Sequence, residues 1–581
     1  MAVRRGVWLV VILIMLAVAI SVTGLTLTLL LVGREPDVAS NSTLVLKVSG
    51  DLQEIEPGGV LGQFLEPPPT VRGLVESLRK AKVDRRVTSV VIRPAGTAAL
   101  WGKVQEVRDA IADFRTSRKP VVAYLEQGGE QEYYLATACD KVFLMPTASL
   151  DLTGIASYEL FLRGTLDKIG AYPDVLHVGE YKTAANTFTE RTFTPSHREM
   201  AESLNKDLYE QLVRGLAAGR RKSEEEVRAL IDHGPYLPED AVRAGLIDDL
   251  AYEDELDDKV QLGKGNVKFL EHDEYRQISA ASLGLNRGSR IAVIYAVGVI
   301  STGRSNFDAP SGPVVGSETI VDYLRKARAD GSIKAVVLRV DSPGGSAIAS
   351  DVIWREMLLT RDVKPVVASM SDVAASGGYY ISMPAHTIVA EPATLTGSIG
   401  VVMIKFAIDG TLKKLGVNLE GVYSGKYADL YSPVRPFSPE ERARVMELMQ
   451  ATYDTFVEKA ASARNTTPER MDTVAQGRVW TGKQAKQIGL VDELGGLERA
   501  LAIAKEKAGL KPDAEVELVV YPPRKSIYDI VRSPFGATDR AAALAVLLGF
   551  GNPRAIQTLT APIQLFRRGE PLAIMPNVFV R

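Results

Sequence analysis

Two short motifs of this 581-residue sequence hold side chains that could transfer acyl groups. Ser376 lies in SDVAASGGYY, and Lys182 lies in VGEYKTA. A serine hydroxyl becomes a nucleophile when a neighbouring base takes its proton, and a lysine whose charged form is disfavoured by burial can serve as that base. The small residues that follow Lys182 would allow the close packing that such burial needs. We therefore interpret Ser376 as a candidate nucleophile and Lys182 as its candidate base.

Glycines near the serine could supply an oxyanion hole. Gly344 and Gly345 belong to RVDSPGGS, and Gly377 directly follows Ser376. Acyl transfer needs N–H donors aimed at the developing oxyanion, and a glycine lets the backbone approach a substrate without a Cβ in the way. Gly345 and Gly377 are the predicted donors, with Gly344 beside them. Each glycine motif alone is usually structural, but both motifs occur here in one half of the chain.

Histidine is the alternative base, but the sequence contains only five histidines and no GxSxG motif. We expect a helix to begin near Ala374, and His386 would then lie about 15 Å from Ser376 along the helix axis. His177 stands on an apolar strand, where a single histidine is most often a packed core residue. Lys182 therefore remains the preferred base.

The elements that must position these residues emerge when the chain is compared with itself. LVESLRKAKVDRRVTSVVIRP (74–94) and IVDYLRKARADGSIKAVVLRV (320–340) align at an offset of 246. Each segment has the pattern of an amphipathic helix, a polar turn and a buried strand. The same register aligns Tyr181 with Tyr427 without a gap. Two copies of one α/β unit, built mainly on parallel strands, are therefore predicted.

The repeat sets the expected domain organisation. The prediction comprises an N-terminal anchor over 1–33, a first repeat over 44–262, a linker over 263–288, a second repeat over 289–510 and a tail over 511–581.

The two copies differ at the residues that could perform chemistry. Ser376 aligns with Glu130, and Lys182 aligns with Ala428. Ser398 of TGSIG aligns with a leucine, and the glycine pair of RVDSPGGS aligns with two alanines. Each copy is incomplete, yet the losses are complementary. We therefore expect the serine of the second repeat to be used with the lysine of the first.

The N-terminus predicts a membrane anchor. Residues 6–33 carry no charge and exceed the roughly 20 residues that a helix needs to cross a bilayer. Two arginines precede this stretch, which favours an orientation with the N-terminus inside and the bulk of the chain outside the cytoplasm. A long cleavable signal is the alternative.

The amino-acid composition excludes several classes of protein and several kinds of metal site. With 46% hydrophobic and 24% charged residues the chain is typical of globular proteins. The net charge of -2 gives no basic surplus for binding nucleic acid. A single cysteine, Cys139, excludes intrachain disulfides, Cys-rich zinc sites and iron–sulfur clusters. No metal and no cofactor is expected.

The motifs RVDSPGGS, SDVAASGGYYIS, EPATLTGSIGVV and VGEYKTA resemble those of the long-form, tandem-repeat signal peptide peptidases of bacterial membranes (the SppA/S49 family). The resemblance covers residues 44–510 and implies a serine endopeptidase with two tandem ClpP/crotonase-like domains after a transmembrane helix. It implies a Ser/Lys dyad of Ser376 and Lys182, with Ser398 bonded to the lysine amine and the glycines of RVDSPGGS lining the oxyanion hole.

The resemblance also implies partners and a location. It predicts a ring-like homo-oligomer, a tetramer, that cleaves remnant signal peptides. The protein would sit in the bacterial inner membrane as a single-pass protein, contacting lipid through residues 6–33, with its catalytic domains in the periplasm. Single-copy relatives carry their lysine where Ala428 stands here, and Lys426 is two residues away from that position.

Two other functions stay open at this stage. A crotonase-like enzyme could use the same glycine donors on acyl-CoA thioesters without a serine nucleophile. A membrane scaffold that binds peptides without cleaving them could have lost half of the catalytic residues in each copy.

Overall fold

The computed structural model describes residues 35–55, 69–260, 268–308, 312–523, 571–575 and 579–580, together with residues 15, 16, 19 and 23. Apart from those four, the predicted anchor over 6–33 lies outside the described residues. No helix within the described residues has the length and apolar character needed to cross a membrane.

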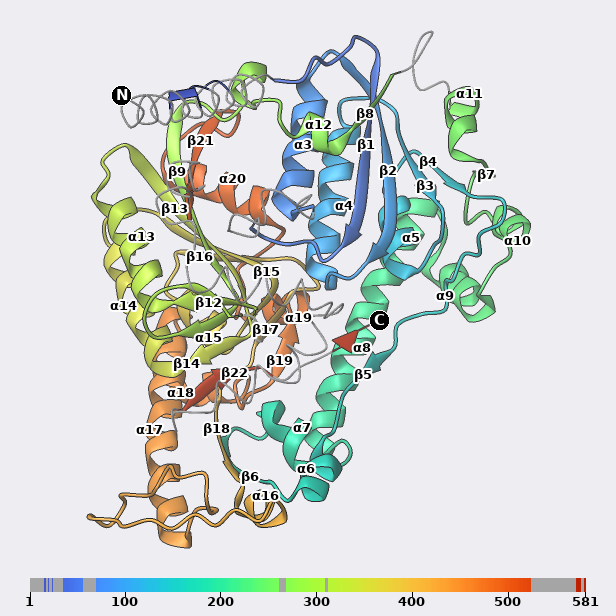
Figure 1. The fold of residues 1–581 in the computed structure, drawn as a ribbon. Coiled ribbons are helices and arrows are strands. Elements are labelled where there is room, and N and C mark those ends of the chain that lie inside the picture. Colours follow the sequence, from blue (N-terminus) through green and yellow to red (C-terminus); the bar gives the residue numbers. More distant parts are fainter. Residues whose placement is uncertain are drawn as a thin grey trace, which may run out of the picture.

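The first repeat is built on a parallel sheet with the strand order β7-β4-β3-β2-β1-β8. Apolar β-branched residues dominate its central strands, which are buried on both faces. Figure 1 shows the strands β1 to β4 of this sheet in blue and cyan, with helices packed beside them. The strands are β1 (Ser42–Gly50), β2 (Val87–Thr97), β3 (Val121–Leu125), β4 (Lys141–Leu144), β7 (Asp249–Leu250) and β8 (Lys268–Glu271).

The second repeat reproduces this order strand for strand, as β20-β16-β15-β13-β9-β21. Two further strands, β17 and β19, continue from β15. The edge strand β8 lies within the predicted linker, and its counterpart β21 lies within the predicted tail. The strands are β9 (Ser289–Val297), β13 (Ile333–Ser342), β15 (Val366–Ala375), β16 (Thr387–Ala390), β17 (Leu395–Gly397), β19 (Val479–Thr481), β20 (Glu493–Leu494) and β21 (Val516–Tyr521).

A third sheet joins the two repeats. Strand β6 (Tyr172–Val178) of the first repeat pairs antiparallel with β18 (Val401–Ala407) of the second, and Val178 lies opposite Val401. The sheet order is β11-β12-β10-β14-β22-β18-β6. Its other members are β10 (Val299–Ser301), β11 (Asn306–Asp308), β12 (Gly312–Gly316), β14 (Gly344–Ser346) and β22 (Leu572–Ile574). This pairing carries the segment after β6, which contains the candidate lysine, into the second repeat.

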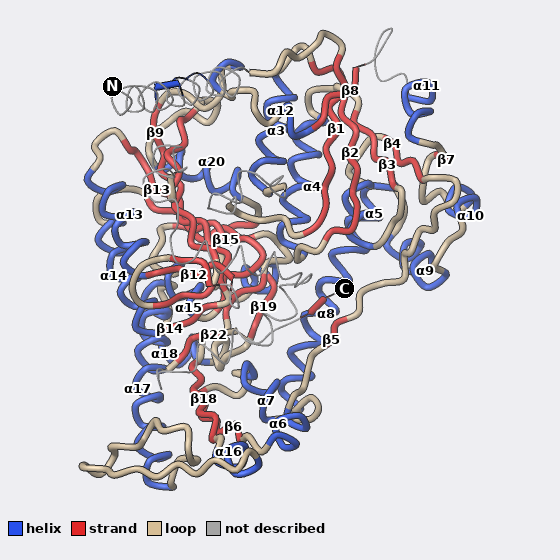
Figure 2. Tube along the Cα trace, in the orientation of Figure 1, coloured by secondary structure: helices blue, strands red, loops and turns tan. Residues whose placement is uncertain are grey.

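Helices surround the sheets in both halves, as the blue tubes of Figure 2 show. In the first repeat they are α3 (Val71–Val83), α4 (Trp101–Arg115), α5 (Glu130–Ala136), α6 (Arg163–Ile169), α7 (Asn186–Thr189), α8 (Pro195–Arg220), α9 (Glu224–His233), α10 (Pro238–Arg243), α11 (Leu256–Val260) and α12 (His272–Tyr275). In the second they are α13 (Ser317–Ala329), α14 (Ala347–Arg361), α15 (Gly377–Ser382), α16 (Asp409–Lys414), α17 (Pro439–Ala463), α18 (Pro468–Asp472), α19 (Gly482–Gln487) and α20 (Leu497–Lys507).

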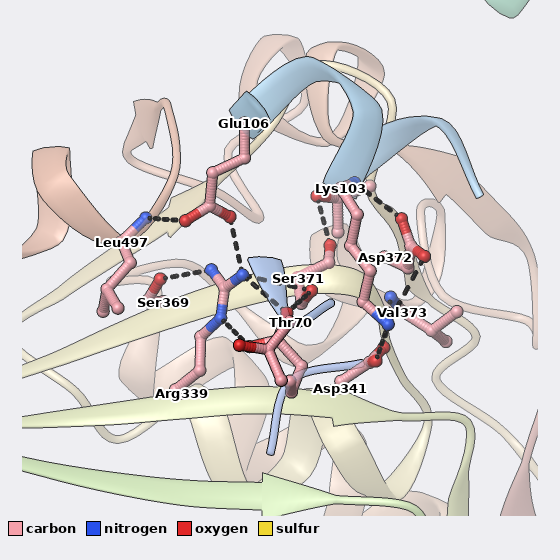
Figure 3. A network of polar contacts seen from close by, with 12 residues as sticks. Thr70, Lys103, Glu106, Arg339, Asp341, Ser369, Ser371, Asp372, Val373 and Leu497 are labelled. Atoms are coloured by element: carbon pink, nitrogen blue, oxygen red, sulfur yellow. Dashed lines mark hydrogen bonds and ion pairs between the residues drawn. The ribbon is translucent and has the colours of Figure 1, made fainter. Parts of the chain in front are cut away.

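A buried ion cluster ties the first repeat to the second (Figure 3). Arg339 of β13 donates to both carboxylate oxygens of Glu54 at 2.8 Å and to Glu106 of α4 at 2.6 Å. It also donates to the hydroxyls of Ser369 and Ser371 on β15. Burial alone would raise the pKa of Glu54, but Arg339 and Lys103 outweigh it and hold that pKa at about 2. The guanidinium therefore neutralises two carboxylates that the other repeat supplies.

A second ion group extends the same contact toward the end of β15. Lys103 of α4 lies 2.7 Å from Asp341 and 3.7 Å from Asp372. The backbone N–H groups of Leu100 and Lys103 donate to the Asp372 carboxylate at 3.0 and 2.8 Å. Because Asp372 precedes the candidate nucleophile by four residues, the first turn of α4 supports the strand that carries Ser376.

Candidate active site

Ser376 stands at the junction between β15 and α15. The structure extends β15 to Ala375 and begins α15 at Gly377, so the helix starts three residues later than the sequence predicted. The backbone of Ser376 has φ 55° and ψ -112°, which non-glycine residues rarely adopt. Its N–H donates to the carbonyl of Gly397 at 2.7 Å. This buried turn fixes the direction of the hydroxyl, and strained backbone of this kind is often found at functional sites.

Lys182 reaches this serine from the other repeat. Its Nζ lies 2.8 Å from Ser376 Oγ and 3.0 Å from Ser398 Oγ, and it donates to the Ser398 carbonyl at 2.8 Å. Both hydroxyls and the amine are buried. The structure therefore brings together the serine, the lysine and the second serine that the sequence singled out.

The surroundings of Lys182 disfavour its charged form. Burial lowers the pKa of the Lys182 amine well below the ordinary value of 10.5. A neutral amine has two N–H donors and one lone pair. The two Ser398 oxygens match the donors, and the lone pair is left for the hydroxyl proton of Ser376. This is the arrangement that a lysine general base requires.

Glycines of the second repeat create the close packing around the lysine. A Cβ added at Gly477, which has φ +77°, would lie 2.6 Å from the backbone of Lys182, and one at Gly400 would lie 3.1 Å from Lys182 Cδ. The Tyr181 N–H donates to the carbonyl of Gln476 at 2.7 Å, which holds the segment in place. Gly477 and Gln476 are not among the residues predicted from the sequence, because only the contact between the repeats brings them to the lysine.

The predicted oxyanion glycines lie beside the serine. A Cβ at Gly377 would lie 3.1 Å from Gly344 Cα and 3.2 Å from Gly345 N, so the two glycine segments touch. Gly344 and Gly345 have φ of 102° and 152°. A Cβ at Gly345 would also lie 2.1 Å from the carbonyl oxygen of Ile300. A side chain at Gly345 would therefore clash with the neighbouring strand, and the Gly344–Gly345 segment contacts the residue that directly follows Ser376.

Other candidate bases lie away from the site. Lys426 is exposed and forms an ion pair with Glu440, and Ala428, the counterpart of Lys182, is exposed as well. His386 accepts a hydrogen bond from a backbone N–H at the start of β15. His177 is exposed, so its interpretation as a packed core residue is wrong. Leu176 and Val178, the neighbours of His177 on the opposite face of β6, pack into the core of the second repeat, while the histidine side chain is exposed.

The first repeat has a carboxylate where the second has its serine. Glu130 Oε1 accepts hydrogen bonds from the N–H groups of Thr153 and Gly154 at 2.8 and 3.0 Å. The repeat register aligns these two residues with the pair that follows Ser398. Glu130 therefore binds its loop as a structural ligand in the position equivalent to the nucleophile.

Comparison with known proteins adds evidence independent of this geometry. The model of peptidase family S49 matches residues 113–266 and 359–511, once in each repeat. The chloroplastic serine protease SPPA of Arabidopsis thaliana is 40% identical over 79% of this chain and 69% of its own length.

Two bacterial relatives extend the match. Protease 4 of Salmonella typhi is 35% identical over 91% of this chain and 87% of its own length. Protease 4 of Haemophilus influenzae is 32% identical over 70% of this chain and 68% of its own length. Two tandem α/β domains, each matched by the family model, and relatives that align along most of the chain establish that this protein belongs to peptidase family S49, as a long-form serine protease of the SppA kind.

Proposed function

We propose that this protease hydrolyses peptide bonds with Ser376 as nucleophile and Lys182 as general base. The observation that carries the proposal is the 2.8 Å approach of Lys182 Nζ to Ser376 Oγ in a buried site, where burial lowers the pKa of the amine. A neutral amine at this distance can accept the hydroxyl proton directly. Ser398 is a positioning residue, because its two oxygens orient the amine toward the nucleophile.

The proposed reaction follows from the placement of these groups. Ser376 Oγ attacks the substrate carbonyl while its proton passes to Lys182 Nζ. The N–H groups of Gly345 and Gly377 stabilise the oxyanion that forms. The lysine ammonium then returns the proton to the leaving amine, which leaves an acyl group on Ser376. Water, deprotonated by the same lysine, releases this group and restores the enzyme.

Two substitutions test the dyad. Ser376→Ala and Lys182→Met should each lower kcat for a fluorogenic peptide by at least about 10³-fold, because removing either member of such a unit disables it. Lys426→Met is the matched control and should leave kcat unchanged, since that lysine is exposed. A fluorophosphonate probe should label the unmodified chain but not Ser376→Ala. Full turnover by either dyad variant would overturn the assignment.

The substrate class and location are part of the same proposal. Remnant signal peptides in the bacterial inner membrane are the proposed substrates, with residues 6–33 as a single-pass anchor and both domains in the periplasm. A relative named putative signal peptide peptidase SppA, from Enterococcus faecium, supports this: it is 37% identical over 38% of this chain and 64% of its own length. Membrane fractionation with protease protection of spheroplasts tests it, and a chain found in the soluble fraction would contradict it.

We also propose a ClpP/crotonase-like fold for each repeat and a homo-oligomer, a tetramer, for the assembly. The segment 418–424 is the repeat counterpart of β6, which in the first repeat pairs with β18. In the segment 418–424 of the second repeat the apolar side chains are exposed, among them Leu419, Val422 and Tyr423. An exposed apolar surface of this kind marks an interaction site. Val422→Asp should reduce the mass measured by light scattering to that of one chain, and an unchanged mass would count against this surface.

A further inference from the structure

The two repeats divide a second set of charged residues, as they divide the serine and the lysine. At the offset of 246, Lys103 of the first repeat aligns with Ala349 of the second, and Asp341 of the second aligns with Ala95 of the first. Asp372 does have a carboxylate counterpart, a glutamate. A lysine found in one copy therefore meets an aspartate found in the other, which is the same complementary pattern that identified the dyad.

Lys103 lies at the start of α4, where it is buried against the two aspartates (Figure 3). Its Nζ is 2.7 Å from a carboxylate oxygen of Asp341 and 3.7 Å from one of Asp372. The packing is close, because a Cβ at Gly102 would lie 3.1 Å from the Asp372 carboxylate. Burial alone would lower the pKa of Lys103, but nearby carboxylates, above all that of Asp341, outweigh burial and raise that pKa above its ordinary value. Unlike Lys182, this lysine keeps its charge and is a counter-ion rather than a base.

The aspartates border a bulge in β15. Between two successive pairs of β13 with β15, β13 advances by two residues while β15 advances by four, from Met370 to Ala374. A bulge leaves backbone groups without a partner in the ladder. The Val373 N–H, which lies in the bulge, donates to the Asp341 carboxylate at 3.2 Å. The carboxylate that Lys103 neutralises therefore replaces a missing hydrogen bond of the sheet.

The first repeat holds the rest of the bulge. The N–H groups of Leu100 and Lys103 donate to the Asp372 carboxylate at 3.0 and 2.8 Å. The hydroxyl of Ser371 donates to the carboxylate of Glu54. Both bulge residues are buried. Each of the positions 371, 372 and 373 is thus fixed by the first repeat, the last of them through the aspartate that Lys103 neutralises.

This bulge leads directly into the candidate active site. Ser376 follows Val373 by three residues, and its backbone is held at φ 55° and ψ -112°. Asp341 precedes Gly344, the first residue of β14, by three residues. Strained backbone persists only where the surrounding structure fixes it. A shift of the bulge would therefore move the nucleophile relative to the glycine strand.

The ammonium of Lys103 also controls the charge of Asp372. Burial raises the pKa of Asp372 to about 6, although Lys103 opposes the rise, and Asp341 adds to it. Without Lys103, two carboxylates would lie close together without this counter-charge, and like charges in a buried site disfavour the ionised form. A protonated aspartic acid is a weaker acceptor for the N–H groups of α4. Removing this one amine would therefore loosen several contacts of the bulge together.

We propose that Lys103 is a positioning residue for peptide hydrolysis: as the counter-ion of Asp341 and Asp372, it holds the β15 bulge in the form that places Ser376 beside the glycine strand. The inference rests on the proposed role of Ser376 as nucleophile. It goes beyond that role because it assigns to the site a second lysine of the first repeat, whose charge the reaction needs even when Lys182 is in place.

Lys103→Met tests the proposal, because it keeps most of the side-chain stem and removes the ammonium. It should lower kcat for a fluorogenic peptide by about 10²-fold with KM nearly unchanged, since a displacement of about 1 Å at the reacting groups has an effect of this size. Lys80→Met is the matched control. Lys80 is a buried lysine of the same repeat that donates to the carbonyls of Tyr275 and Ile278, away from the bulge. Its variant should keep kcat within about threefold below its unfolding transition.

A double variant separates the loss of charge from the loss of packing. Lys103→Met combined with Asp341→Asn leaves one uncompensated carboxylate instead of two and keeps an amide oxygen for the Val373 N–H. It should recover at least about tenfold of the lost kcat. A double variant no more active than Lys103→Met would show that the stem of the lysine, and not its charge, matters, which would overturn the proposal.

Hydrogen–deuterium exchange separates this inference from the dyad assignment. In the Ser376→Ala chain, Lys103→Met should speed amide exchange across 371–377 at least about tenfold, whereas Lys80→Met should leave it unchanged. This measurement needs no turnover. Unchanged exchange in 371–377, or a kcat of Lys103→Met within about threefold of the unmodified chain, would overturn the positioning role. Turnover by Ser376→Ala with faster exchange in the Lys103→Met chain would instead overturn only the choice of nucleophile.

Discussion

Removing the Arg339 guanidinium should weaken the contact between the two repeats. The loss in the free energy of unfolding can be estimated from the structure. Arg339→Met keeps the aliphatic stem but leaves the carboxylates of Glu54 and Glu106 buried without their counter-charge. Both carboxylates are less than 10% exposed. Removing one partner of a buried ion pair costs about 3–5 kcal/mol. We expect a loss of this size in the free energy of unfolding.

Thermal unfolding followed by circular dichroism measures this loss. For a domain the size of one repeat, 1 kcal/mol shifts Tm by about 2–4 °C, so Arg339→Met should lower the first transition by about 6–20 °C. Peptidase activity should be lost together with that transition, because Lys182 reaches Ser376 only while the repeats are docked. Arg444→Met is the control: its ion pair with Glu447 is exposed and should be worth less than about 1 kcal/mol.

A compensated variant identifies the cause. If the unpaired carboxylates produce the loss, then Arg339→Met combined with Glu54→Gln and Glu106→Gln should recover at least half of it, since no charge is left buried. A shift below 3 °C for Arg339→Met, or an equal shift for the triple variant, would refute the reasoning. Either result would mean that the cluster is not what holds the repeats together.

Three further predictions concern the site itself. The value of kcat/KM should fall as pH falls through the lowered pKa of Lys182, because protonation removes the base; a profile that is flat from pH 9 to pH 5 would contradict this. Ser398→Ala should reduce kcat by about 10–100-fold at nearly constant KM and move the acidic limb of the pH profile, whereas a change in KM alone would argue against a positioning role. Gly345→Ala should abolish turnover, because its Cβ would lie 2.1 Å from the Ile300 carbonyl oxygen; activity within threefold of the unmodified chain would show that this strand does not form the oxyanion site.

The sequence predicted the paired α/β units because each copy repeats the same helix and strand periodicity. It also predicted that Ser376 and Lys182 would meet, since each stands where the other copy has lost its reactive residue. The antiparallel pairing of β6 with β18 could not be predicted, because the hydrophobic pattern of a strand does not show which other strand it will pair with. The same holds for Arg339, whose partners come from segments about 230 to 290 residues away in the chain.

The placement of β22 lay further beyond prediction. Residues 571–575 carry no repeat counterpart and only a short apolar pattern, and they pair with β14 across more than 200 residues of chain. Glycines such as Gly477 were missed for a related reason. These positions require glycine because Lys182 of the other repeat packs against them. The residues next to them in the sequence do not indicate this contact.

The difference between Lys182 and Ala428 follows from environment rather than from motif. Ala428 is exposed, so a lysine there would stay solvated and protonated and could not accept a proton from a serine. Lys182 is buried only because β6 inserts beside β18 of the other repeat and Gly400 and Gly477 close around it. Docking of the repeats is therefore what makes this lysine a base. Once both repeats share one chain, one docked lysine and one serine suffice, and the counterpart positions are free to become alanine and glutamate.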